Sequence, residues 1–385
     1  QVVCAVCHSY SGHLYEILGA EYGMLDGLTM KNDFCNSLVA ACEGQIDFPT
    51  YGGVSYCDQH TGGSDNVDLF WSYPYTPCES PLLFDSLVRS LRLSLPERAV
   101  VAHNWNQQSP GGDMFWIVGQ AGEVKSVNAN NIDSATVVDI SGAIPSGGSF
   151  YLDYEEGLLD AAFDPDFDNN GYFYLSYTCL LDPNEMQRNR LSKFVYTAGD
   201  PDATRLSEEV LLTSVPKYNS IHSAGWLGFK PSAYSSPAFE NELFWTTGDG
   251  GPQTDYNNEA QDTSNLLGSM IRILVPIDGT GYSIPSGNYP TGGLPEICAP
   301  GFRNPFRCSF DKLNDDLYCG DVGHTNLEEI DIVVCGQNYG WSRFEGSRCQ
   351  EAVEGNAFNP PCMEGSRDGF TFPWYEYCHP DYDST

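Results

Sequence analysis

After about residue 95 the chain alternates short apolar runs with polar turns. The segments 113–127, 169–178, 240–250 and 314–323 share one form, in which a turn of Asn, Asp or Gly accompanies an aromatic-rich run. Most of these runs end in Gly or Asp. Short runs of this composition between turn residues are typical of β-strands. The pattern therefore predicts hairpins rather than long helices.

The last three of these segments follow another short apolar run, at 158–165, 224–231 and 306–311. Each copy thus has the order strand, polar turn, strand, and the copies recur along the chain as in a radial β-repeat. One such hairpin cannot bury its faces alone, so neighbouring copies supply the core. We predict a mainly β chain with a β-propeller over residues 96–385.

The first part of the chain has a different period. In residues 13–27 and 32–44 apolar side chains recur at helical spacing, and Gly or Asn stands at the ends. Six of the 14 cysteines lie in this part. The hydrophobic core of so short a segment is small and benefits from covalent crosslinks. We therefore expect a helical, disulfide-stapled module over residues 1–78 and a linker over residues 79–95.

One aspartate-rich segment has two interpretations, a calcium loop or the turn of a hairpin. Aspartates occupy alternate positions in residues 164–168. An EF-hand loop places Gly at its sixth position and Glu at its twelfth, whereas counting from Asp164 gives Asn169 and Leu175. The segment therefore predicts a hairpin, in which residues 169–171 adopt positive φ.

The charge of the chain excludes some classes of partner. It has 18 basic and 52 acidic residues, a formal net charge of −34. Such a surface repels nucleic acids and anionic membranes and attracts divalent cations and basic protein surfaces, although solubility alone also accounts for it. Hydrophobic residues make up 41% of the chain, enough for a sizeable core.

The cysteines indicate an oxidising compartment. Cys4 and Cys7 form a C-x-x-C motif, but no second pair follows at the spacing of a zinc ribbon, which favours disulfides. The sequence starts at Gln1, as a processed secreted protein would, and no apolar run approaches the about 20 residues of a membrane span. No N-x-S/T sequon occurs. We expect a secreted, extracellular protein.

Five stretches taken together, 155–167, 221–229, 243–251, 301–311 and 318–341, resemble the glucose/sorbosone dehydrogenase family. The last of them, which contains "GDVGHTNLEEIDIVVCGQNYGW", is the most specific. The resemblance follows the order of the whole chain and is closest to the Hedgehog-interacting-protein branch. It implies a six-bladed propeller preceded by a folate-receptor-like cysteine-rich module.

The resemblance implies a catalytic pair. In the sugar dehydrogenases a histidine that opens an H-x-x-G-x-L strand is the general base, and this position matches His222. An aspartate in a following G-D-x-G turn orients the histidine and matches Asp249. The pairing is chemically sound, because a carboxylate fixes the tautomer of the imidazole and stabilises the imidazolium.

The resemblance also implies a cofactor and a metal. An R-N-P motif that contacts pyrroloquinoline quinone (PQQ) matches Arg303 and Asn304, where a guanidinium and an amide would stabilise negative charge on the quinone. The loop whose backbone carbonyls bind the active-site Ca2+ matches Gly323 and His324. Calcium favours such oxygen ligands.

Two departures weaken the expectation of catalysis. Where the enzymes have a cofactor-contacting glutamine, this chain has Glu155, whose carboxylate would repel a cofactor that itself carries carboxylates. The enzymes also use cationic side chains from their last blades, which would lie past Thr385. The propeller is therefore expected to be incomplete, either because the native chain continues, the explanation we favour, or because self-assembly or another partner covers the open edge.

Disulfides follow partly from the hairpins. Cys308 and Cys319 flank one hairpin, and adjacent strands bring such β-carbons within bonding reach. Cys349 and Cys362 bracket a loop, and the related family implies that they pair. The partners of the other four cysteines in the propeller part remain open.

Three functions remain. The first is a secreted, non-catalytic, Hedgehog-interacting-protein-like propeller that binds an extracellular protein or carbohydrate, or takes part in assembly. The second is a PQQ- and calcium-dependent sugar (aldose) dehydrogenase. The third is a structural component of the extracellular matrix. Fold and motif residues persist after activity is lost, so the motifs alone do not decide between them.

Overall fold

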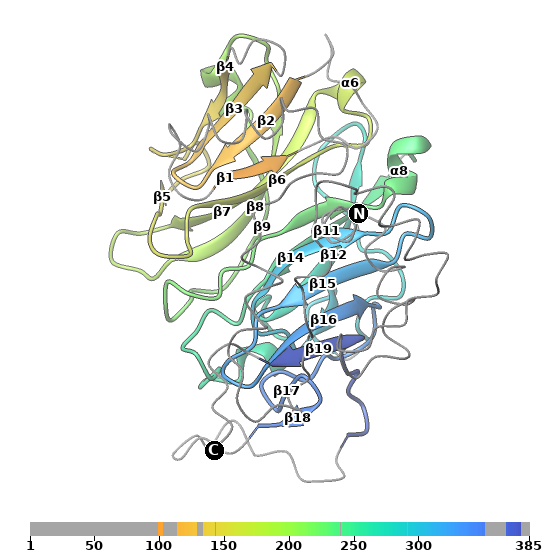
Figure 1. Cartoon of the computed structure of the whole chain (residues 1–385). Coiled ribbons are helices and arrows are strands. Elements are labelled where there is room, and N and C mark those ends of the chain that lie inside the picture. Colours follow the sequence, from red (N-terminus) through yellow and green to blue (C-terminus); the bar gives the residue numbers. More distant parts are fainter. Residues whose placement is uncertain are drawn as a thin grey trace, which may run out of the picture.

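The computed structural model describes residues 99–102, 114–128, 134–142, 144–238, 240–290, 292–350 and 367–378 (Figure 1). Strands predominate there and form three four-stranded sheets, one five-stranded sheet and one two-stranded ribbon. The predicted helical module and linker lie outside these residues. No helix in the described part has the length and apolar composition to cross a membrane.

The first sheet is an antiparallel meander. Its strands are β1 (Ala99–Ala102), β2 (Met114–Gly119), β3 (Glu123–Asn128) and β4 (Ser134–Asp139). Gly122, in the turn between β2 and β3, has a φ of +105°, and a Cβ there would lie 2.9 Å from the backbone of Ser141. Only glycine fits this turn without strain.

The second sheet has five strands, β5 (Ser149–Phe150), β6 (Leu158–Phe163), β7 (Tyr172–Leu180), β8 (Arg188–Val195) and β9 (Glu209–Thr213). A short helix, α7 (Pro201–Leu206), connects β8 to β9. It begins at Asp200, whose side chain accepts a hydrogen bond from the backbone N–H of Ala203 at 2.9 Å.

The hairpin predicted for the aspartate-rich segment is confirmed, but its turn differs from the prediction. β6 pairs with β7, and the turn contains a helical segment, α6 (Phe167–Asn170). Only Gly171, of the three residues expected at positive φ, adopts it (φ 68°). The Asp164 carboxylate is buried and accepts hydrogen bonds from the Asp166 N–H, the Asn170 amide and the Tyr174 hydroxyl. These bonds favour the helical turn.

The third and fourth sheets follow the same plan. The third contains β10 (Leu227–Phe229), β11 (Glu240–Thr247), β12 (Ser269–Pro276) and β13 (Ile297–Pro300), with helices α8 (Pro231–Ser235) and η3 (Glu259–Gln261) in its connections. The fourth contains β14 (Pro305–Phe310), β15 (Leu317–Asp321), β16 (Leu327–Val333) and β19 (Tyr375–Cys378). The ribbon pairs β17 (Phe344–Glu345) with β18 (Arg348–Cys349).

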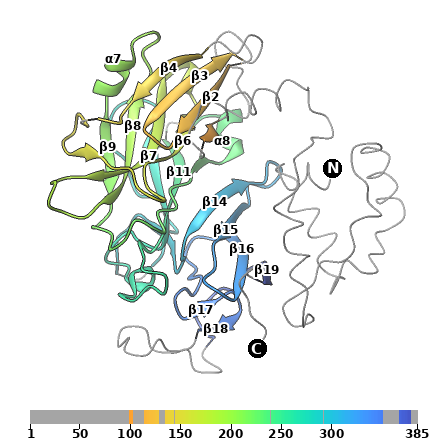
Figure 2. The ribbon, with the colours of Figure 1, turned by 60° about the vertical axis from the view of Figure 1, so that its left-hand side comes forward.

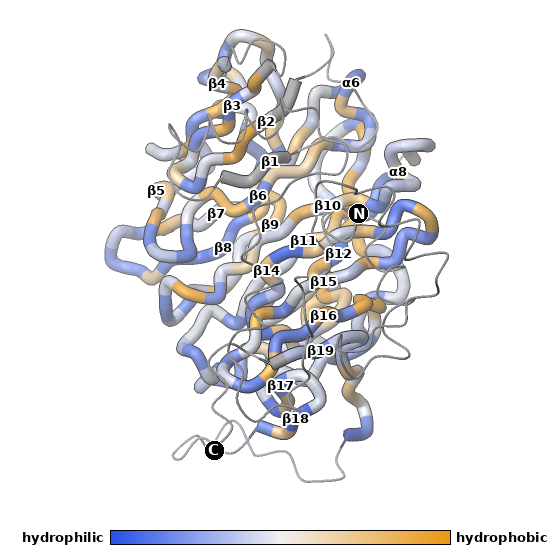
Figure 3. The backbone as a smooth tube through the Cα atoms, in the orientation of Figure 1, coloured by the Kyte–Doolittle hydropathy of each residue, from blue (hydrophilic) through white to orange (hydrophobic). Residues whose placement is uncertain are grey.

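Successive sheets pack face against face. In both views the first and fourth sheets lie at opposite ends, with the other two between them (Figures 1 and 2). Apolar segments follow the strands, and the connecting loops are mostly hydrophilic (Figure 3). At least one aromatic pair joins each sheet to the next. Examples, with their ring-centroid distances, are Trp116–Phe163 (4.6 Å), Tyr174–Phe229 (5.5 Å) and Phe244–Phe310 (5.3 Å).

The structure describes two disulfides in the propeller part, whereas Cys179, buried in β7, is a free cysteine. The predicted Cys308–Cys319 bond is confirmed and joins β14 to β15 at paired positions. A second bond, between Cys298 and Cys335, settles one of the pairings that the sequence left open. Cys349 is disulfide-bonded, whereas its predicted partner Cys362 lies outside the described residues.

Candidate functional site

The predicted site residues all flank the first hairpin of a sheet. In an antiparallel hairpin, the start of the first strand and the end of the second lie at the same edge. Residues 155 and 222 precede the first strands β6 and β10, and residues 303–304 precede β14. Residues 249 and 323–324 follow the second strands β11 and β15. Stacking of the sheets therefore brings these segments together.

His222 and Asp249 form a buried pair. The Nδ1 atom of His222 lies 2.6 Å from Oδ1 of Asp249, and the side chains are 4% and 0% exposed. Oδ1 also accepts the Gly251 N–H at 2.8 Å, and Oδ2 accepts the indole N–H of Trp341 at 2.8 Å. Because a carboxylate can only accept, the Nδ1 atom of His222 carries the proton and donates it in this hydrogen bond. The Nε2 atom is then the basic nitrogen of the ring.

Glu155 connects the histidine segment to the R-N-P motif. Its Oε2 atom accepts the backbone N–H of His222 at 2.7 Å and the side-chain amide of Asn304 at 3.3 Å. The other end of that amide, Oδ1 of Asn304, accepts the N–H of Ala224 at 3.0 Å. Both polar ends of the Asn304 side chain therefore bond within the protein.

Arg303 is also held by the protein. Its Nε and Nη1 atoms donate to the carbonyls of Gln253 (3.2 Å) and Val322 (3.1 Å), and its guanidinium lies over the Trp341 ring, 5.4 Å from the centroid. The backbone N–H groups of Arg303 and Asn304 donate to the Asp321 carboxylate at 2.8 and 2.6 Å. The bond to Val322 connects Arg303 to the start of the predicted calcium loop.

The structure thus joins five predicted residues, Glu155, His222, Asp249, Arg303 and Asn304, in one hydrogen-bonded network beside residues 323–324. The backbone carbonyl of Arg303 closes it by accepting the Asp249 N–H at 2.9 Å. The catalytic, cofactor and metal roles of these residues stay predictions.

Sequence reasoning missed Trp341 and Asp321, although both lie in the most specific family-like segment. Their bonds to Asp249 and to the R-N-P backbone appear only in the fold. It also missed a buried ion pair between Lys217 and Glu156, 2.5 Å apart, in which Lys217 also donates to Ser223 at 2.6 Å. No pattern around Lys217 indicates this role.

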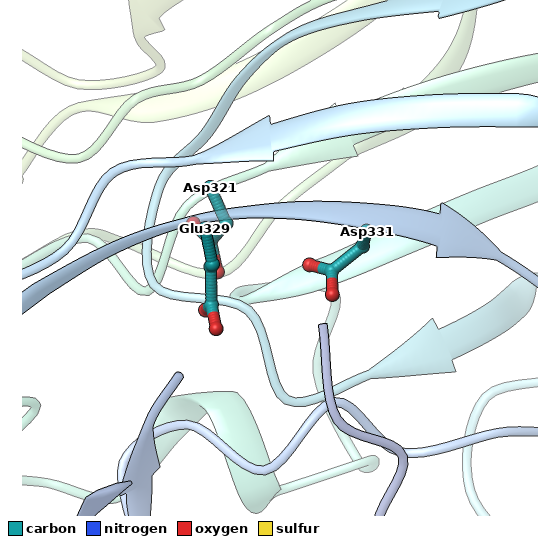
Figure 4. Close-up of side chains that lie close together, drawn as sticks. All are labelled: Asp321, Glu329 and Asp331. Carbon is teal, nitrogen blue, oxygen red and sulfur yellow. The ribbon is translucent and has the colours of Figure 1, made fainter. Parts of the chain in front are cut away.

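A carboxylate trio next to the site could hold a cation. Asp321, Glu329 and Asp331 each offer an oxygen within 4.8 Å of the others (Figure 4). Asp331 is 1% exposed, and neither of its oxygens has a hydrogen-bond partner. Carboxylate oxygens suit Ca2+ and Mg2+. In the described part of the chain, this is the one group of such side chains with that spacing.

The trio makes stability depend on pH. Burial, and then the neighbouring carboxylates, raise the pKa of Glu329 and Asp331 well above the usual range, and burial raises the pKa of Asp321 to about 7. The folded state therefore holds protons that the unfolded chain releases near about pH 4. This contribution is complete below that pH and is lost as the pH rises through the folded values.

We expect Asp331→Asn to raise the free energy of unfolding near neutral pH by about 1–3 kcal/mol in EDTA, because it removes a buried carboxyl group that must take up a proton on folding or carry an uncompensated charge. Urea unfolding across a pH series measures this effect, and the decline with pH should become shallower. Asp168→Asn, which removes one charge from an exposed position, is the control. Equal pH profiles for the two variants would contradict the assignment.

The sequence of the chain matches a known protein family over most of its length. The family model described as glucose / sorbosone dehydrogenase matches residues 102–372. The chain belongs to this family. The match covers strands β2 to β18 and the whole hydrogen-bonded network, so the glucose/sorbosone dehydrogenase resemblance seen in the sequence is confirmed.

Among curated proteins, this family member is similar to the HIPL2 protein of Arabidopsis thaliana, with 30% identity over 300 residues, or 64% of the chain and 40% of that protein. It is also similar to the human Hedgehog-interacting protein, with 28% identity over 203 residues, or 48% of the chain and 28% of that protein. The chain thus spans less than half the length of either relative.

A solved structure shares the fold. The PQQ-bound aldose sugar dehydrogenase of Streptomyces coelicolor superposes with a TM-score of 0.51 at 21% identity, covering 74% of each chain. The predicted mainly β, propeller-type fold is therefore confirmed for this member of the glucose/sorbosone dehydrogenase family, and its four large sheets correspond to blades.

The described residues do not fit a polyanionic quinone in this family member. The hydrogen-bonded network contains the carboxylates of Glu155, Asp249 and Asp321, whereas the guanidinium of Arg303 donates to two backbone carbonyls. The other nearby cation, Lys217, is fully buried against Glu156. Carboxylates repel a ligand that is itself anionic.

Proposed function

We propose that this chain is a Hedgehog-interacting-protein-like extracellular binding protein that does not turn over sugars. One observation carries the proposal: Glu155 bonds to the His222 backbone and to the Asn304 side chain. The amide that would face a quinone oxygen donates instead to a carboxylate of the protein. Negative charge that develops on a bound quinone would be repelled at this position.

The charge and the relatives support a binding role. The net charge of −34 favours partners with a basic surface, and the human relative is named for its interaction with Hedgehog. The two described disulfides agree with an oxidising, extracellular environment. The partner we expect is an extracellular protein, with carbohydrate as the alternative.

A second candidate is a PQQ- and calcium-dependent aldose dehydrogenase. It is favoured by the His222–Asp249–Trp341 arrangement, which would let Nε2 of His222 accept a hydroxyl proton while Asp249 stabilises the imidazolium. Asp249 is buried and has its own donors, so the pair is oriented before any ligand arrives. The same bonds also hold the blades together.

A quinone titration separates the candidates. We expect PQQ with Ca2+ to bind the purified protein weakly and to support no dye reduction with aldoses. Glu155→Gln should raise the affinity for PQQ by about tenfold, or about 1.4 kcal/mol, because it removes the repulsion but keeps an acceptor for the His222 N–H. The exposed Asp153→Asn is the matched control. Turnover by the unchanged protein that disappears in His222→Ala would overturn the proposal.

A further inference from the structure

Glu345, the last residue of β17, binds the backbone of the predicted calcium loop. Its Oε1 atom accepts the consecutive backbone N–H groups of His324, Thr325, Asn326 and Leu327, at 2.7, 2.8, 2.8 and 3.2 Å. The side chain is 2% exposed. One buried carboxylate oxygen thus accepts a hydrogen bond from each backbone amide of residues 324–327.

The second oxygen of Glu345 fixes the orientation of the carboxylate. Oε2 accepts the side-chain amides of Asn326, at 2.6 Å, and of Gln350. The Glu345 carboxylate thus accepts hydrogen bonds from four backbone amides and two side-chain amides. Hydrogen bonds to a carboxylate are stronger than those between neutral groups.

The loop backbone has little freedom around this carboxylate. A Cβ at Gly323 would lie 1.7 Å from the carbonyl oxygen of Leu327, so only glycine fits. In a trans peptide the C=O points opposite to the N–H of the same peptide unit. Because the N–H groups of residues 324–327 converge on Glu345, the carbonyls of residues 323–326 point away from it.

We infer that Glu345 is a positioning residue, which shapes the 323–327 loop so that the carbonyl oxygens of Gly323 and His324 form one side of a calcium site. Calcium favours carbonyl oxygens, and a loop that already presents them loses less entropy on binding. The carbonyl before them, that of Val322, already accepts a bond from the Arg303 guanidinium. The inference does not depend on quinone turnover and applies to a binding protein as well as to an enzyme.

Calorimetric titration with CaCl2 tests the inference in an Asp331→Asn background, which removes the carboxylate trio as a competing site. We expect Glu345→Gln to weaken Ca2+ binding at least about tenfold. It should also speed hydrogen exchange of the amides of residues 324–327. Glu376→Gln is the matched control, because Glu376 accepts bonds from Ser347 and none that the structure gives from the loop. The Ca2+ affinity of the Glu376→Gln control should stay within about twofold of that of the Asp331→Asn protein.

The outcomes of this calcium titration can be distinguished from those of the dye-reduction assay with aldoses, which tests the proposed function. Faster exchange with unchanged calcium affinity would overturn the positioning role, and equal losses in both variants would indicate a general charge effect instead. A background protein that binds no Ca2+ would overturn the calcium site. If Glu345→Gln does not fold, Asn326→Ala removes one bond to Oε2 and keeps the four backbone bonds. It should weaken binding by less than about tenfold, and no change would contradict the inference.

Discussion

Gly248→Ala is expected to lower the free energy of unfolding by about 3 kcal/mol, because the new Cβ has no space. A Cβ at this position would lie 2.1 Å from the carbonyl oxygen of His222, 2.6 Å from its carbonyl carbon and 3.1 Å from the carbonyl oxygen of Arg303. All three atoms belong to the backbone, so no rotamer change relieves the clash. The substitution therefore forces apart the two segments that carry the predicted base and the R-N-P motif.

Urea unfolding measures this loss, and Gly142→Ala is the control. Gly142 lies in an exposed loop, and a Cβ there meets nothing within 4 Å. We expect a change of about 0.5 kcal/mol or less for the control. Similar stabilities for the two variants would show that the site tolerates a wider separation than the structure has.

Lys217→Met is expected to cost about 3–5 kcal/mol of stability, because it leaves the Glu156 carboxylate buried without its counterion. Both side chains of the pair are 0% exposed. Burial raises the pKa of Glu156, and Lys217 opposes that rise, so the variant should hold Glu156 protonated in the folded state. The stability of the variant should then decline as the pH rises above the unfolded value of about 4.

Two further variants separate this effect from a loss of packing. Adding Glu156→Gln to Lys217→Met should recover at least half of the loss, since no unpaired charge remains. Arg205→Met, in a surface pair whose Arg205 and Asp202 side chains are 27% and 83% exposed, should change stability by less than about 1 kcal/mol. A double variant no more stable than the single one would contradict the ion-pair explanation.

The sequence contained enough to place the strands and most of the site. Alternating apolar runs predicted the hairpins, and the order of first and second strands explains why His222, Asp249 and Arg303 meet at one edge. The turn at residues 167–170 was harder to predict. Its helical form depends on the buried Asp164 and its bond to the Tyr174 hydroxyl, which exists only after the strands pair.

Other contacts could not be predicted because they join segments far apart in the chain. Trp341 reaches Asp249 across 92 residues, and Glu155 reaches Asn304 across 149. Glu155 was identified from the resemblance as a departure that would repel a cofactor. Its internal role, as an acceptor for two neighbouring blades, required the structure.

Asp321 belongs to two assemblies at once. Its oxygens accept the backbone N–H groups of Arg303 and Asn304, and the same carboxylate is one third of the buried trio. An effector that changes the charge of the trio therefore alters the strength of both bonds to the backbone of Arg303 and Asn304. If the effector changes the affinity for a second ligand that contacts this backbone, thermodynamic reciprocity requires that ligand to change the affinity of the trio for the effector by the same factor.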